Sequence, residues 1–279
     1  MFVYRLFSFI VLLSIFFISI LVEGSIGKSA FLIFALLLSF GGVWEILNML
    51  EKIERKSFKK AGALLGMLTV LYAFFAENLG CPVFGVMAIM VVLCWFSFLF
   101  ANNNRDYLEK VMNTLSGYIL IVVPLIPLIF IYDYKHGNVS GGILLLYMIL
   151  VTKSGDTGAY CTGTLTHKLL GNNHKIVPSI SPKKSWEGTL GGLLISTLMS
   201  IILWKYMLKL DDMIIPLIAG VIMFWGGFCG DLAESVLKRI SGVKDSNDII
   251  PGMGGVLDVL DSLLLNAPLF YFIFLPLIK

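Results

Sequence analysis

The chain has 279 residues, of which 58% are hydrophobic and only 14% are charged, and its mean hydropathy is +0.90. Since roughly a quarter of the residues in a soluble domain are charged, this composition excludes an ordinary soluble protein and predicts a polytopic helical membrane protein. The net charge of +3 is too small to suggest a nucleic-acid partner.

Apolar runs recur along the whole chain, each near the roughly 20 residues that an α-helix needs to cross the hydrocarbon core. The sequence therefore predicts an all-α integral membrane protein with about nine transmembrane helices, at 3–22, 29–50, 61–77, 82–101, 113–132, 142–161, 189–210, 214–230 and 258–278. The first run resembles a signal peptide, but it lacks a convincing small-residue cleavage site and similar runs follow it. We interpret it as the first span.

Basic residues are distributed unevenly over the predicted loops. Of the 21 basic residues, 15 fall on one side of the membrane and 5 on the other, and Lys153 falls within a span. Because cytoplasmic loops carry the excess of Lys and Arg, the bias predicts a cytoplasmic N-terminus and a C-terminus outside. The same rule accounts for the basic loop 51–60 without a substrate role.

Cysteines and histidines show no spacing that is typical of a metal site or a disulfide framework. They are scattered along the chain: Cys81, Cys94, Cys161, Cys229, His136, His167 and His174.

The two halves of the chain differ in polarity. Up to residue 150 the loops are short and the spans carry little polar chemistry, whereas two long cytoplasmic loops follow, at about 162–188 and 231–257. Lys153 and Asp156 lie inside or at the end of the sixth span, where ionisable residues are costly and usually face a polar cavity. We therefore divide the chain into a scaffold with dimer contacts, 1–150, and a catalytic region, 151–279.

Two polar stretches follow residue 150. In KSGDTGAYCTG (153–163) the glycines suit helix packing at least as well as ligand binding, but the carboxylate of Asp156 needs a partner or a cation. In SISPKKSWEGTLGG (179–192), Ser181 before Pro182 predicts a helix N-cap and first helical residue. Unpaired N–H groups at this helix start, beside Lys183 and Lys184, would suit a phosphate. Alternatively, the stretch is an ordinary boundary between a loop and a membrane span.

The stretch GDLAESVLKRISG (230–242) combines an acid with two cations. Helical spacing places four polar residues on one face: Asp231, Ser235, Lys238 and Arg239. This face could bind a metal at the acid, near the membrane end of the helix, and phosphates at the two cations one or two turns further along. Alternatively, it could form a surface network of salt bridges.

The stretch KDSNDIIPGMGGVLDVLDS (244–262) gathers carboxylates around a glycine-rich turn. Gly254 and Gly255 permit a tight turn whose N–H groups can face an anion. Asp258 and Asp261 follow on one helix face, where two carboxylates repel each other unless a cation or proton lies between them. Oxygen ligands without a Cys/His cluster favour a hard ion, and we expect Mg²⁺.

The runs SPKKSWEG, GDLAESVLKR and KDSNDIIPGMGGVLDVLDS, in that order, resemble the phosphatidate cytidylyltransferase (CDP-diacylglycerol synthase) family. The close resemblance covers about 153–262. Residues that match the family signature include Ser235, Lys238, Arg239, Lys244, Asp245, Pro251, Gly252, Gly254, Gly255, Asp258 and Asp261. Two positions depart from it, because Met253 replaces the family's usual His and Val259 its usual Arg.

The resemblance implies that CTP and phosphatidate react to give CDP-diacylglycerol and pyrophosphate for phospholipid synthesis, with Mg²⁺ required and a second cation such as K⁺ left open. By family analogy, Asp231 and Asp258 hold the metal, Asp261 or Asp245 assists, and Lys238 and Arg239 meet phosphate oxygens. The other expected substrate-binding residues are Asp156, Ser181, Pro182, Lys183, Lys184, Ser235, Lys244, Gly254 and Gly255.

The resemblance also implies a homodimer, and we expect a bacterial-type plasma membrane with the active site facing the cytoplasm. Three alternatives stay open: a CTP-dependent lipid or polyprenol kinase, a transporter, and a catalytically silent homologue, which the departures at Met253 and Val259 would permit. A CDP-alcohol phosphatidyltransferase is disfavoured because no D-G-x-x-A-R run is present.

Overall fold

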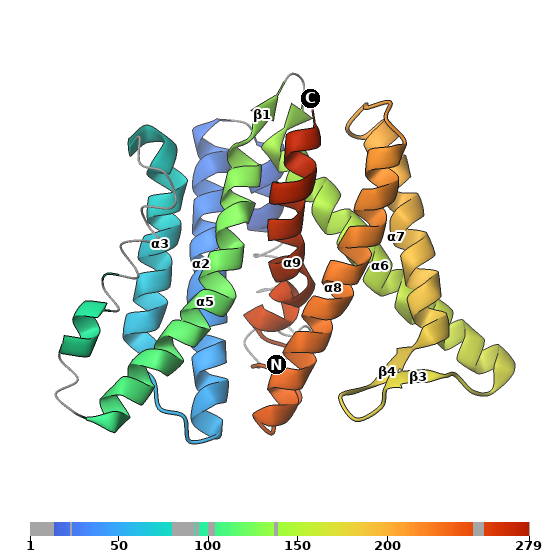
Figure 1. The fold of residues 1–279 in the computed structure, drawn as a ribbon. Helices are drawn as coiled ribbons and strands as arrows, with labels where there is room; N and C mark the ends of the chain where they lie inside the picture. The colour runs from blue at the N-terminus through green and yellow to red at the C-terminus, as the bar shows by residue number, and fades with distance from the viewer. Residues whose placement is uncertain are drawn as a thin grey trace. The chain divides into compact units, whose positions relative to one another are not determined.

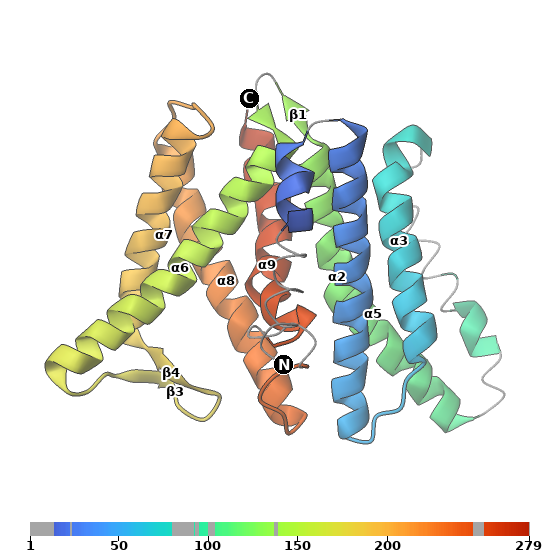
Figure 2. The same ribbon diagram turned by 180° about the vertical axis from the view of Figure 1, so that it is seen from behind.

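The computed structural model describes residues 14–22, 24–79, 92, 95–99, 104–136, 139–247 and 254–278, and these are nearly all helical (Figures 1 and 2). The main helices are α2 (Ser25–Lys52), α3 (Lys59–Leu79), α5 (Arg105–Asp133), α6 (Gly141–Leu170), α7 (Trp186–Tyr206), α8 (Ile214–Ile240) and α9 (Val256–Leu269). A π-helical turn (Phe270–Phe274) and a 3₁₀ turn (Leu275–Leu277) continue α9. Two short antiparallel hairpins pair β1 (Lys135–His136) with β2 (Val139–Ser140) and β3 (Lys175–Val177) with β4 (Ser181–Ser185).

Within the described residues, six helical segments are long and apolar enough to cross a membrane. They are Ser25–Lys52, Lys59–Ala76, Arg105–Asp133, Trp186–Tyr206, Ile214–Ile240 and Val256–Leu277. Between its two ends, a helix satisfies its backbone hydrogen bonds within its own segment, which hydrocarbon requires. The helical membrane-protein class is therefore supported. The predicted spans 3–22 and 82–101 lie mostly outside the described residues, and the count of nine and the orientation of the termini stay predictions.

The described chain forms two compact units. The first contains residues 1–129 and 240–260, and its core is made by α2, α3 and most of α5, which lie side by side in Figures 1 and 2. Small residues allow these helices to approach closely: a Cβ at Gly62 would lie 2.8 Å from the Thr114 side chain, and one at Gly117 would lie 2.7 Å from Leu47. Val43, Leu47 and Ile121 are fully buried there.

The second unit contains residues 130–239 and 261–279, with α6 crossing α7 as Figure 2 shows. A stripe of small residues on α7, spaced four apart, is buried: Gly188, Gly192, Ser196 and Ser200. Small residues at this spacing let membrane helices pack closely. The Ser196 hydroxyl donates to the Val151 carbonyl of α6, which joins the two helices.

The opposite face of α7 carries exposed apolar side chains, Leu190, Leu194 and Leu198. Their spacing of four residues places them in one row along the helix. An apolar row of this kind suits contact with lipid.

Aromatic side chains fill the core of the second unit. The ring of Tyr147 in α6 lies 5.7 Å from Trp204 of α7 and 6.0 Å from Phe270, measured between centroids. All three are nearly inaccessible. The Tyr147 hydroxyl is satisfied by the Ser200 hydroxyl at 2.5 Å.

Two local predictions were wrong. The loops expected at 162–188 and 231–257 are shorter, because α6 continues to Leu170 and α8 to Ile240. Hydropathy locates the end of an apolar run, whereas polar helix formers such as those after Gly230 continue the helix beyond it. The division at residue 150 into scaffold and catalytic region stays a prediction.

The predicted N-cap at Ser181 was also wrong. Ser181–Ser185 is strand β4, and the helix begins at Trp186 with Ser185 as its N-cap, whose hydroxyl oxygen accepts from the Gly188 N–H at 3.2 Å. Ser181 before Pro182 has a sequence typical of an N-cap. Pairing with β3 keeps 181–185 extended, so the second serine caps the helix.

Candidate active site

A cluster of carboxylates lies in the second unit, where α8 meets α9. One ligand oxygen from each of Asp231, Glu234 and Asp261 lies within 4.8 Å of the others. Asp231 and Glu234 share a face of α8 because they are three residues apart. Glu234 is buried, while the other two are partly exposed. Carboxylates this close repel one another, so the cluster needs positive charge.

Lysines from three different elements supply this charge, one beside each carboxylate. Lys184 of β4 lies 2.8 Å from Asp231, and Lys238 of α8 lies 2.9 Å from Glu234. Lys153 of α6 lies 3.7 Å from Asp261. We call these six side chains the carboxylate–lysine centre.

Lys153 also links the centre to α6 and α9. Its ammonium donates to the Ser262 hydroxyl at 2.7 Å and to the Asp156 carboxylate at 3.4 Å. The predicted need of Asp156 for a partner is met by this lysine, one turn away on the same helix. Four helices or strands therefore contribute to one polar group of side chains.

The β3–β4 hairpin explains how Lys184 reaches the centre. The hairpin precedes α7 directly, and Lys184 donates to the Phe228 carbonyl at 3.2 Å with its ammonium 4.1 Å from the centroid of the Phe228 ring. Lys183 and Pro182, its neighbours in the strand, are exposed. Arg239 donates to the Ile180 carbonyl at 3.4 Å, which joins the end of α8 to the same hairpin.

The donor set of the centre fits a hard divalent cation. Three carboxylates provide the oxygen ligands that Mg²⁺ prefers, and no sulfur or imidazole takes part in this set. Asp231 and Asp261 were predicted here, but sequence reasoning missed Glu234 and did not assign Lys153 to the site. The spacing of Glu234 from Asp231 (i, i+3) and from Lys238 (i, i+4) is the signal that could have identified it.

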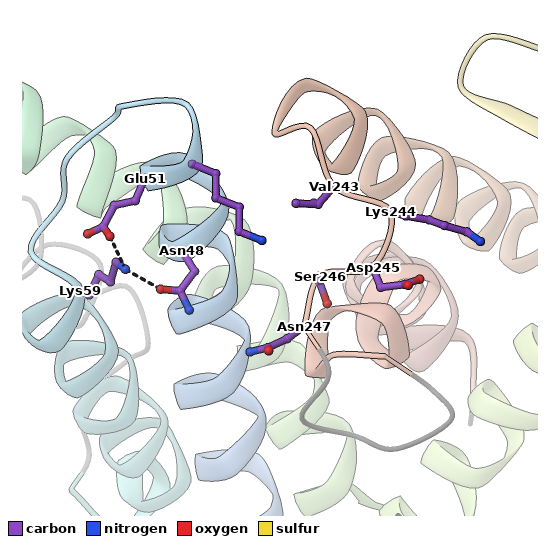
Figure 3. A pocket seen from close by; sticks show the side chains of 9 residues that line it. Asn48, Glu51, Lys59, Val243, Lys244, Asp245, Ser246 and Asn247 are labelled. Carbon is purple, nitrogen blue, oxygen red and sulfur yellow. Dashed lines mark hydrogen bonds and ion pairs between the residues drawn. The ribbon is translucent and has the colours of Figure 1, made fainter. Parts of the chain in front are cut away.

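Other predicted site residues lie in the first unit, around a pocket of about 660 Å³. Its lining includes Lys244, Asp245, Ser246 and Asn247 on one side, and residues from the end of α2 and the start of α3 on the other. Figure 3 shows Asn247 and Val243 pointing toward α2, while Lys244 and Asp245 point away from it. On the other wall Lys59 is held by Glu51 and Asn48, each at 2.5 Å (Figure 3).

Asp258 lies in the first turn of α9. One of its oxygens accepts from the Gly255 N–H at 2.6 Å and from both the N–H (3.2 Å) and the hydroxyl (2.6 Å) of Ser246. These contacts resemble the acidic half of a helix capping box. Its predicted role as a metal ligand stays a prediction. The predicted residues Pro251, Gly252 and Met253 lie outside the described residues.

Comparison with protein families matches residues 3–276 to the Cytidylyltransferase family. Phosphatidate cytidylyltransferases of Staphylococcus epidermidis and Bacillus subtilis are 29% and 31% identical to the chain over 258 and 259 residues. These matches cover 91% and 89% of the chain and 92% and 90% of the relatives.

Two relatives match over a shorter region. The uncharacterized protein YnbB of Escherichia coli is 36% identical over 60% of the chain, and a Haemophilus influenzae phosphatidate cytidylyltransferase is 40% identical over 52%. The chain spans about half the length of these two, 54% and 50% respectively.

The apolar helices support a helical membrane protein, and three of its carboxylates lie close enough together to hold a metal ion. The chain belongs to the cytidylyltransferase family, as the resemblance of its motifs predicted.

Proposed function

We propose that this chain transfers the cytidylyl group of CTP to phosphatidate in a bacterial plasma membrane. In this reaction a phosphate oxygen of the lipid attacks the α-phosphorus of CTP. The bond between the α-phosphorus and its bridging oxygen breaks, so the products are CDP-diacylglycerol and pyrophosphate. The carboxylate–lysine centre, in a chain of this family, is the observation that carries the proposal.

The chemistry of the centre suits this reaction. The attacking phosphate oxygen is already anionic near neutral pH, so no histidine base is needed, and positioning with charge neutralisation can supply the catalysis. Lys153, Lys184 and Lys238 bring three positive charges to one place. We propose that they bind phosphate oxygens of the two substrates.

A Mg²⁺ ion held by Asp231, Glu234 and Asp261 would neutralise phosphate charge and orient the substrates. We further propose that Asp258, in the first turn of α9, contributes to binding this ion. Lys244, Asp245 and Arg239 are proposed substrate contacts. A homodimer is proposed on the resemblance alone, and an active site facing the cytoplasm on the distribution of basic residues.

The direct test is an assay of the detergent-solubilised protein with CTP, phosphatidate and Mg²⁺, with and without EDTA. CTP labelled in the cytidine or α-phosphate should yield a labelled lipid, and EDTA should abolish the transfer. Transfer of the γ-phosphate with release of CDP would instead show a lipid kinase. Absence of both activities in a folded protein would favour a silent homologue.

The departure at Val259 allows a second test of the silent alternative. Introducing the arginine that the family pattern has there, Val259→Arg, should change the rate little if the chain is already active. A large gain of activity from an inactive parent would contradict the proposal.

A further inference from the structure

A buried glutamate of α2 contacts the start of α9. Glu45 is fully buried, and it accepts the N–H groups of Val256 at 2.9 Å and Leu257 at 2.8 Å. The two acceptors are different oxygens of the same carboxylate. The first N–H groups of a helix have no partner within the helix, and the positive end of its dipole favours an anion. Glu45 therefore caps α9 from a helix that lies more than 200 residues earlier in the chain.

Ser246 joins this cap to Asp258. Its hydroxyl lies 3.0 Å from a Glu45 oxygen and 2.6 Å from an Asp258 oxygen. A hydroxyl has one proton, so the two carboxylates compete for it. The N–H groups of Ser246 and Gly255 also donate to Asp258. Two carboxylates are thus held near each other by backbone N–H groups and one shared hydroxyl.

The packing around this junction leaves no space for a side chain at Gly255. A Cβ on Gly255 would collide with the Ser246 hydroxyl and with the Glu45 carboxylate. A side chain at this position would separate the groups that the hydrogen bonds hold together. The contacts of Glu45 with α9 therefore depend on a glycine at the helix N-cap.

We propose that Glu45 is a positioning residue: it fixes the first turn of α9, the helix that carries Asp258 and Asp261, and through Ser246 it fixes the Asp258 carboxylate. Glu45 itself meets backbone N–H groups and a serine, and it acts on the reaction through this helix. The inference deepens the proposed cytidylyl transfer and rests on it.

The test uses Glu45→Gln in the full-length protein. Glutamine has the same shape, but one of the two accepting oxygens becomes an NH₂ group that faces a backbone N–H. Because supporting partners of a catalytic site typically contribute about 10- to 100-fold to activity, we expect kcat to fall by that factor. The KM values for CTP and phosphatidate should change by less than about threefold, since the substrate contacts remain.

The matched control is Glu109→Gln. Glu109 undergoes the same chemical change, but its side chain is 42% exposed and pairs with Arg55 at 2.6 Å. Its kcat should stay within about twofold of the parent, as is typical of an exposed ion pair.

Amide hydrogen exchange provides a readout that does not need activity. Loss of the cap should accelerate exchange at residues 254–260 by about tenfold, while exchange in α7 stays unchanged. If Glu45→Gln does not fold, Ser246→Ala removes only the bridging hydroxyl and should shift both readouts in the same direction by a smaller factor. Combining the two changes should give less than the sum of their effects, because both act on one junction.

The outcomes separate the two proposals. An active parent in which Glu45→Gln alters neither kcat nor exchange at 254–260 overturns the positioning role alone. A folded parent without cytidylyl transfer, but with accelerated exchange in Glu45→Gln, overturns the proposed function and leaves Glu45 as a structural cap.

Discussion

The two compact units use carboxylates in different ways. In the second unit, Asp231, Glu234 and Asp261 each lie beside a lysine side chain. In the first unit, Glu45 and Asp258 are satisfied mainly by backbone N–H groups and one hydroxyl. A lysine side chain can rotate and pair its ammonium with a substrate phosphate instead, whereas the N–H groups of a helix terminus are fixed. The lysine-paired carboxylates of the second unit therefore suit chemistry, and the carboxylates bound to N–H groups in the first unit suit support.

The strongest test of this difference is Asp231→Asn in the carboxylate–lysine centre. The change removes a proposed metal ligand and leaves Lys184 beside a neutral group. We expect cytidylyl transfer to fall by more than about 100-fold, while the unfolding temperature in detergent changes little. Full transfer by the folded variant would show that the cluster is structural, and the comparison between the units would fail.

Glu234→Gln tests whether the residue that sequence reasoning missed belongs to the centre. The amide can still accept a hydrogen bond from Lys238, but it is a poorer ligand for a hard cation. A titration of activity with Mg²⁺ should shift to concentrations about 10- to 100-fold higher. An unchanged titration, with a lower unfolding temperature, would assign Glu234 a role in packing only.

Gly254→Ala tests the supporting junction in the first unit. Gly254 has a φ of +92°, where side chains other than glycine are strained, and its Cβ would collide with the Asp258 carboxylate. We expect the free energy of unfolding to fall by about 1–3 kcal/mol, which thermal or chemical denaturation in detergent would measure. An equally stable variant would mean that the turn can relax, and that the junction is less rigid than its contacts indicate.

Lys184→Met and Lys183→Met form a matched pair with the smallest expected effects. Sequence reasoning treated the two lysines alike, but Lys184 pairs with Asp231 and Lys183 is exposed. Removing Lys184 should lower kcat/KM by about tenfold, the value of one charge-assisted hydrogen bond, and removing Lys183 should lower it less. Equal losses would indicate that both lysines contact substrate directly.

The local pattern of the sequence was sufficient for several features. Apolar runs predicted the helices that could span a membrane, since hydrocarbon leaves the backbone few alternatives. The spaced motifs of 153–262 predicted the family, and the i, i+3 spacing within α9 placed Asp258 and Asp261 on one helix. The N-cap was misplaced because Ser181-Pro182 has the local sequence of a helix start, and only the pairing of β4 with β3 keeps these residues extended.

Tertiary structure decided which carboxylate meets which partner. The contacts of Glu45 with Val256 and of Lys153 with Ser262 join residues that are 211 and 109 positions apart. No periodicity of the sequence reports on such pairs, because periodicity describes one element at a time. The sequence determined the helices and the family, whereas the folded chain determined that some acids meet lysines and others meet the fixed N–H groups of a helix terminus.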